Sequence, residues 1–348
     1  MKRPSFWFVL FVFVLAGVLA FTNQNPFLQI TEKDVLVNLP KNFPKPVYRF
    51  AGNKPSPEGF TLGRKLFYDE ILSKDGTVSC ATCHQRIAAF AHIDHALSHG
   101  IYAKIGTRNV PALQNLLWNT SFMMDGRVTD LESQPVNPIT NAIEMDETME
   151  GVEKKLRSNN EYRQLFARAF GDSMATKDKI LKALAQFTGL MISSNSRYDK
   201  FMRHEDTLSA MEKNGLTTFR KKCTGCHSEP LLTDNTFRNT GLAPDSSLKD
   251  TGRGKITANK NDDFKFRVPG LRNIEITYPY MHDGRFRNLQ QVIAFYANGA
   301  NFGRGADPML RKIGALSAKE QSELLAFLKT LTDRQFLYDR RFADPRMP

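Results

Sequence analysis

The cysteines of this chain fall into two copies of the motif Cys-x-x-Cys-His. This motif is typical of covalent haem attachment, in which two thiols add to the haem vinyl groups and the following histidine faces the iron. A thioredoxin-like redox pair, two disulfides, or one zinc site built from both cysteine pairs are alternatives, but none needs a histidine after each pair. The sequence favours two haem c groups, attached through Cys80, Cys83 and His84 and through Cys223, Cys226 and His227.

The N-terminus has the features of an export signal. Lys2 and Arg3 precede an apolar run over 6–21 that is shorter than the ~20 residues of a membrane span. Small residues near its end predict a signal peptide at 1–20, cleaved after Ala20, and an uncleaved anchor is the alternative. Both interpretations predict a periplasmic protein, and haem c is commonly attached after export.

A length of 348 residues suggests two domains, and each half of the chain holds one cysteine pair. We expect an extended lead-in, a first domain with the first motif, a second domain with the second motif, and a tail. Their predicted bounds are 21–56, 57–203, 204–333 and 334–348.

Helical patterns dominate the elements that must position these motifs. Apolar residues recur at helical spacing over 180–191, and Ser317 with Glu320 forms a capping box before another apolar stripe. The stretch 152–170 is a weaker helical candidate, and alternating strand patterns are scarce. The fold class is therefore predicted to be mainly α.

Two segments between the helical patterns, 92–145 and 228–286, are long and rich in Gly, Pro, Asn and Asp. Loops of this length are uncommon in compact domains unless they serve a function. Wrapping a large cofactor would be such a function.

Several short segments follow the two haem motifs in a fixed order. They read RNVP at 108–111, FMMDGR at 122–127, DLESQ at 130–134, EM at 144–145, LRN at 271–273 and PYMHDGRF at 279–286. Together with the haem motifs they resemble the dihaem cytochrome c peroxidase family, including its MauG-like branch, over about 57–333. The resemblance implies two cytochrome c-like domains, each wrapping one covalently bound haem c, and a C-terminal tail that returns to the first domain.

The resemblance also implies an activity. In that family the first haem reduces hydrogen peroxide, and the second receives electrons from a small donor, a cytochrome c or a copper protein. Glu144 and Gln134 match the pocket residues of the family. The carboxylate would move a proton from the inner to the outer peroxide oxygen, and the amide would orient the peroxide. The alternatives are a MauG-like oxidase of a protein or organic substrate and a non-catalytic electron carrier.

The sixth ligands of the two irons separate these functions. For the first haem the choice lies between His92, His95, His99 and none, and we favour His99 because it immediately precedes Gly100, as in the ligand loop of the family. At the second haem the family position is Tyr296, where the peroxidases use Met and the MauG-like enzymes use Tyr. A phenolate lowers the iron potential relative to Met.

The segment between the haems departs from the family at one position. Met124 stands where the family commonly has a Trp that relays electrons, and a thioether cannot serve as a ring-based carrier in the same way. Trp118 and Phe122 lie nearby in the sequence and are candidate replacements.

Two further features concern ions and charge. Asn109, Thr277 and Pro279 match an inter-domain calcium site of the family, which uses a side-chain oxygen and two backbone carbonyls. Arg108 and Arg285 are candidate partners of the haem propionates.

The formal charge of +12 could indicate nucleic-acid binding, but export and the lack of a long basic run argue against it. The haem propionates would balance part of this charge, and the remainder could steer an acidic electron-donor protein. A homodimer is a further prediction.

Overall fold

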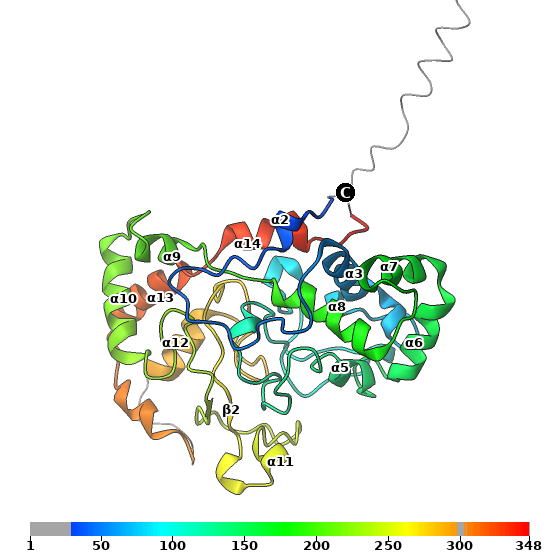
Figure 1. Cartoon of the computed structure of the whole chain (residues 1–348). Coiled ribbons are helices and arrows are strands. Elements are labelled where there is room, and N and C mark those ends of the chain that lie inside the picture. Colours follow the sequence, from blue (N-terminus) through cyan, green and yellow to red (C-terminus); the bar gives the residue numbers. More distant parts are fainter. Residues whose placement is uncertain (1–28, 298–302, 304, 348) are drawn as a thin grey trace, which may run out of the picture.

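The computed structural model describes residues 29–297, 303 and 305–347 (Figure 1). The predicted signal peptide and the start of the lead-in lie outside the described residues. The prediction of a mainly α fold is confirmed. The α-helices are α2 (Glu32–Val35), α3 (Pro57–Tyr68), α4 (Cys80–Cys83), α5 (Val136–Thr140), α6 (Met149–Ser158), α7 (Asn160–Phe170), α8 (Lys177–Gly189), α9 (Arg197–Met202), α10 (Ala210–Lys222), α11 (Gly254–Thr257), α12 (Leu289–Ala297), α13 (Ala318–Lys329) and α14 (Arg334–Tyr338).

Regular β-structure is minor in the part of the chain that the structure describes. The strands β1 (Phe237–Arg238) and β2 (Phe266–Arg267) form one antiparallel pair, in which Phe237 lies opposite Arg267. The long segments 92–145 and 228–286 are otherwise largely irregular, with short 3₁₀ turns.

The helices begin where their capping residues predict. Ser317 and Glu320 form the expected capping box of α13, and the apolar stripe over 180–191 becomes the buried face of α8. The weaker candidate over 152–170 is two helices rather than one. Asn159 separates α6 from α7, because its side chain accepts hydrogen bonds from the backbone of Glu161 and Tyr162 and so caps a new helix.

Two hydrophobic cores organise the described residues. The larger core lies around α3 and α8, and the smaller one lies around α10 and α13 (Figure 1). In each, a glycine brings two helices into close contact. A Cβ at Gly63 of α3 would lie 2.0 Å from the carbonyl oxygen of Ala183, and one at Gly215 of α10 would lie 1.9 Å from that of Glu323. In both cores, therefore, the helix that precedes the Cys-x-x-Cys-His motif packs closely against a helix that follows it.

A buried polar junction joins the two cores. The carboxylate of Asp333 accepts hydrogen bonds from the hydroxyl of Ser193 (3.1 Å) and from the backbone N–H of Ser194 (2.9 Å). The backbone N–H of Asp333 donates to the side chain of Asn273 at 2.7 Å. Asp333 thus ties the end of the first core to the loop 271–273 of the second.

Beyond Asp333, the C-terminal segment packs on the larger core. Phe336 and Phe342 are buried there, and the hydroxyl of Tyr68 donates to the carbonyl of Phe342 at 2.6 Å. None of the helices within 29–297 and 305–347 is both long and apolar enough to cross a membrane.

Candidate haem sites

The first motif sits on α4 and the loop that follows it. Nδ1 of His84 lies 2.8 Å from the carbonyl oxygen of Phe90, to which it donates a hydrogen bond. This bond leaves the lone pair of Nε2 free for a metal. Burial lowers the pKa of His84 to about 4, which keeps the ring in the neutral form that a metal ligand requires.

The second motif, at the end of α10, uses the same device. Nδ1 of His227 lies 3.1 Å from the carbonyl oxygens of both Leu232 and Pro269. Burial lowers the pKa of His227 as well. Both proximal-ligand candidates are therefore neutral and are held by backbone carbonyls rather than by carboxylates.

A cavity of about 400 Å³ lies beside the second motif. Its volume is within the usual range for cofactor sites, about 300–1,000 Å³. Cys223, Cys226, His227 and Tyr296 all line it, so the structure brings both attachment thiols and both predicted axial ligands of this site to one cavity. Burial raises the pKa of Tyr296, and the two thiols nearby add to that shift. The hydroxyl is therefore neutral unless a cation, such as an iron, holds it as a phenolate.

One arginine in this cavity wall fits a carboxylate of a haem. Arg267 lines the cavity, and its Nε is buried without a hydrogen-bond partner. Its guanidinium donates a 3.4 Å hydrogen bond to the amide oxygen of Asn235, and burial lowers its pKa to about 10. Arg238 also lines the cavity, but its guanidinium already pairs with Asp234 and Asp307, with N–O distances of 2.9 and 3.0 Å. Arg267 has no carboxylate partner among the described residues, and because a buried cation without a carboxylate is costly, a haem propionate would supply the missing partner.

The arginines singled out from the sequence are already engaged. The guanidinium of Arg108 pairs with Asp125 and Asp250, with N–O distances of 2.7 and 2.6 Å. Arg285 pairs with Asp283. The sequence did not single out Arg267, because its burial depends on how 228–286 folds around the cavity.

Glu144 lies close to the first motif. Its backbone carbonyl accepts a hydrogen bond from the N–H of Ile101 at 2.8 Å, and a Cβ at Gly100 would lie 2.6 Å from its Cα. The carboxylate raises the pKa of the Cys83 thiol, after the larger effect of burial. Burial raises the pKa of Glu144 itself, although Asn141 donates a hydrogen bond to it at 2.8 Å. The side chain is thus a carboxyl with a raised proton affinity, and its charge acts on the thiols of both Cys80 and Cys83.

Gln134 lies two residues before α5, and Glu144 lies four residues after the end of this short helix. The side-chain N–H of Gln134 donates to the sulfur of Met123 at 3.5 Å. The next residue, Met124, lines the cavity of the second motif, as does Trp118. Met123 therefore contacts Gln134, and its neighbour Met124 lies in the wall of the second cavity. The sequence did not indicate this position for Met123.

The three histidines after the first motif form one cluster. The ring centroids of His92 and His95 are 5.4 Å apart, and those of His95 and His99 are 4.3 Å apart. Nδ1 of His92 is buried without a hydrogen-bond partner. The carbonyl oxygen of His99 accepts a hydrogen bond from the Cys83 thiol at 3.3 Å. His99 is therefore next to the first motif, and its assignment as an axial ligand stays a prediction.

The three predicted calcium ligands all line the second cavity. The side-chain nitrogen of Asn109 lies 2.5 Å from the carbonyl oxygen of Pro279. The amide oxygen of Asn109 accepts a hydrogen bond from the N–H of Val110 at 2.7 Å. Asn109 and Pro279 are thus in direct contact, with Thr277 in the same wall.

The alternative of a zinc site built from both cysteine pairs is wrong. Residues 29–297, 303 and 305–347 contain no group of three or more His, Cys, Asp or Glu side chains that could hold a metal ion. The two pairs belong to different cores, with Cys80 packed on the larger and Cys223 on the smaller. All four cysteines are free thiols, and no disulfide joins them.

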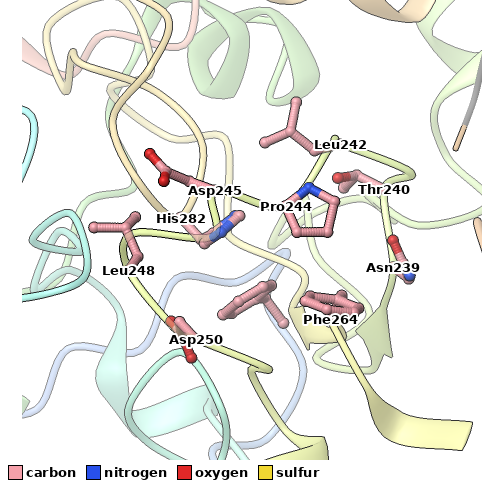
Figure 2. A pocket seen from close by; sticks show the side chains of 10 residues that line it. Asn239, Thr240, Leu242, Pro244, Asp245, Leu248, Asp250, Phe264 and His282 are labelled. Atoms are coloured by element: carbon pink, nitrogen blue, oxygen red, sulfur yellow. The ribbon is translucent and has the colours of Figure 1, made fainter.

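A second, much smaller pocket lies against the same loops (Figure 2). His282 lines both this pocket and the large cavity. The pocket holds about 10 Å³, enough for roughly one water molecule. It is therefore not a haem site.

Comparisons with known proteins agree with this geometry. Residues 57–207 match the profile of the di-haem cytochrome c peroxidases. The chain is 34% identical over 302 residues to the methylamine utilization protein MauG of Methylophilus methylotrophus, covering 84% of this chain and 86% of that protein. The chain belongs to the di-haem cytochrome c peroxidase family. It is also 34% identical over 279 residues to cytochrome c551 peroxidase of Nitrosomonas europaea, covering 79% of this chain and 80% of the peroxidase.

Solved structures of this family have the same fold. A MauG-like protein associated with microbial copper homeostasis superposes with a TM-score of 0.83 at 32% identity, covering 89% of this chain and 99% of that protein. The diheme peroxidase BthA of Burkholderia thailandensis superposes with a TM-score of 0.71 at 23% identity, covering 82% and 88%. The similarity to BthA supports a shared fold and nothing more. Membership of the family identifies the chain as an oxidoreductase of the cytochrome c peroxidase type, with two haem groups implied.

Proposed function

We propose that this protein is a periplasmic dihaem peroxidase that reduces hydrogen peroxide to water. One haem c would be held by Cys80, Cys83 and His84, and the other by the second motif, so that each of the two domains wraps one haem. The observation that carries the proposal is the position of Glu144, a carboxyl of raised proton affinity. Its backbone is hydrogen-bonded to Ile101, two residues after the His99 carbonyl that the Cys83 thiol contacts.

The residues of the first site have distinct tasks in this reaction. A haem bound there would supply the iron that takes up peroxide and the electrons that split its O–O bond. Glu144 accepts a proton from the inner oxygen of the peroxide and returns it to the outer oxygen, which leaves as water. Gln134 orients the peroxide by hydrogen bonding, and the hydrogen bond from Asn141 holds the Glu144 carboxyl in one orientation. Two electrons and two protons convert each peroxide to two water molecules.

Electrons are proposed to enter at the second haem from a small cytochrome c or copper protein. Met124 and Trp118 line the second cavity, and Met123 contacts Gln134, so this segment offers a short path between the sites. The basic excess of the chain favours an acidic donor. The predicted export signal and homodimer are also part of this proposal.

Tyr296 favours a second candidate function. It lines the cavity of the second motif together with His227, where a phenolate ligand would stabilise the oxidised iron more than a thioether does. The MauG-like branch of the family has Tyr at the corresponding position. A MauG-like oxidase that draws electrons from a protein or organic substrate would use the same two haem sites.

A calcium ion is proposed at the contact between Asn109 and Pro279. Its ligands would be the amide oxygen of Asn109 and the carbonyl oxygens of Thr277 and Pro279, which suit a hard cation. For this, the Asn109 amide must turn its oxygen toward Pro279, and the two ends of an amide are not distinguished by shape.

The test is steady-state turnover of the purified, haem-loaded protein with hydrogen peroxide and a reduced small cytochrome c. We expect peroxide-dependent oxidation of the donor. If peroxide bleaches the haems but the donor is not oxidised, the peroxidase proposal fails. Oxidation of added protein substrates under the same conditions would then support the oxidase.

A further inference from the structure

We propose that the C-terminal segment 334–342 positions the proximal ligand of the first haem. The inference rests on the proposed haem at His84. The residues that follow the second core in the sequence would thus act at the haem site of the first core.

The loop 85–91 presents the carbonyl that orients His84. The N–H of Gln85 donates to the carbonyl of Ala91, and that of Phe90 donates to the carbonyl of Gln85, both at 2.8 Å. This closed loop aims the Phe90 carbonyl at Nδ1 of His84. Ala89 and Phe90 have φ values of 52° and 61°, in the left-handed region that residues with a Cβ rarely adopt. Such a conformation persists only where the surroundings enforce it.

The C-terminal segment supplies much of that enforcement. The ring of Phe90 is fully buried, and its centroid lies 5.9 Å from that of Phe336 and 6.4 Å from that of Phe342. The guanidinium of Arg86, in the same loop, donates to the carbonyl of Leu337 at 3.0 Å. Aromatic packing and one charged hydrogen bond therefore hold the loop 85–91 against the C-terminal segment.

The segment is in turn anchored at its start. Asp333 caps α14 by accepting a hydrogen bond from the N–H of Phe336 at 3.1 Å, while its own N–H is bound to Asn273. The end of the segment is tied to α2, because the guanidinium of Arg341 donates to the carbonyl of Asp34 at 2.7 Å. A rigid connection thus runs from the loop 271–273, through Asp333 and α14, to Phe90.

The hydrogen bond from His84 to Phe90 determines how basic the ligand is. A strong acceptor at Nδ1 makes the imidazole a better donor and stabilises the oxidised iron. If Phe336 and Phe342 no longer hold Phe90, the carbonyl drifts and this stabilisation weakens. The reduction potential of the first haem should then rise.

The second haem is an internal control for this effect. His227 is oriented by Leu232 and Pro269, and Leu232 belongs to the smaller core, whereas Phe336 and Phe342 belong to the larger. Loss of the two phenylalanines should leave its potential unchanged.

The experiment compares Phe336→Ala/Phe342→Ala with the wild-type chain, both as haem-loaded proteins. Haem content, the EPR g-values of each ferric haem and a redox titration are measured. Tyr338→Ala is the matched control, because Tyr338 lies on the same helix with 69% of its surface exposed. We expect shifted g-values and a raised potential for the first haem only, no change in Tyr338→Ala, and recovery in Phe336→Leu/Phe342→Leu.

An unchanged first haem in the double alanine variant, with two haems still bound, would overturn the inference. A change of equal size at both haems would also overturn it, since it would report general loosening. If the double variant does not fold, Phe336→Ala alone is read in the same way. A wild-type protein without haem at the first motif would instead contradict the proposed function.

Discussion

Replacing Glu144 with Gln is the most direct test of the proposed chemistry. The substitution keeps the size of the side chain and its contact with Asn141, but the amide cannot accept and return a proton. A general acid–base residue typically contributes about 10²- to 10⁴-fold to a rate, which corresponds to about 2.7–5.4 kcal/mol of barrier at 1.36 kcal/mol per tenfold. Within the described residues, the hydrogen bond to this carboxylate comes from the side chain of Asn141, which cannot carry a proton. We therefore expect a loss of about 10³-fold.

The pH dependence of kcat/KM is a second test of the role of Glu144. Burial raises the pKa of Glu144, so the carboxyl stays protonated to a higher pH than usual and is then unable to accept the proton of peroxide. In the wild-type enzyme kcat/KM should fall as the pH drops through that raised pKa. In Glu144→Gln this acid limb should vanish.

The stability of the Glu144→Gln variant distinguishes a loss of catalysis from misfolding. Because the raised pKa means that the folded state binds this proton more tightly than the unfolded state, the contribution of Glu144 to stability is present at low pH and is lost as the pH rises through the raised value. A neutral Gln does not bury a charge, so the variant should be at least as stable as the wild type at pH 7. Glu150→Gln, an exposed position on α6, is the matched control for turnover. Turnover of Glu144→Gln within tenfold of the wild type, with both haems bound, would refute the role of the carboxylate.

Four further outcomes follow from the geometry. Gly100→Ala should lower peroxide turnover, because the new Cβ would lie 1.8 Å from the Ile143 carbonyl oxygen and would displace the neighbouring Glu144. The spectrum of the second haem should stay unchanged, and normal turnover would contradict this close contact. Tyr296→Met should raise the potential of the second haem and change its visible spectrum, and an unchanged spectrum would reject the tyrosine as its ligand. Arg267→Gln removes a buried cation from the second cavity, so a redox titration should give a lower reduction potential for the second haem. An unchanged potential would argue against a propionate next to Arg267. Removing calcium with a chelator should lower turnover, which added Ca²⁺ should restore, and Asn109→Ala should be insensitive to both treatments.

Local patterns in the sequence predicted the main helices well. The capping box at Ser317 and the apolar stripe of α8 depend on residues a few positions apart, so they can be recognised without tertiary structure. The split at Asn159 was missed, since Asn is equally common in loops and at helix starts.

The candidate sites were predicted in part, for a similar reason. Glu144, Gln134 and Tyr296 were indicated by their place in family motifs, and the structure puts Glu144 and Tyr296 near the attachment thiols. The carbonyl of Phe90 that orients His84 has no side-chain signature and could not be found in the sequence. The burial of Arg267 also depends on a long irregular segment, whose path the sequence pattern does not determine.

The packing of the C-terminal segment on the larger core also constrains how the protein is made. Arg86 and the Leu337 carbonyl that it binds are 251 positions apart, and Phe336 and Phe342 fill the core that surrounds the first motif. Domains generally fold in order from the N-terminus as the chain is synthesised. Here the N-terminal core lacks two of its own rings until the last residues of the chain have been made. Biogenesis therefore includes an interval in which the residues of the second core are all present while the first core is still incomplete, and the loop after Cys80 and Cys83 is not yet held by Phe336 and Phe342 during that interval.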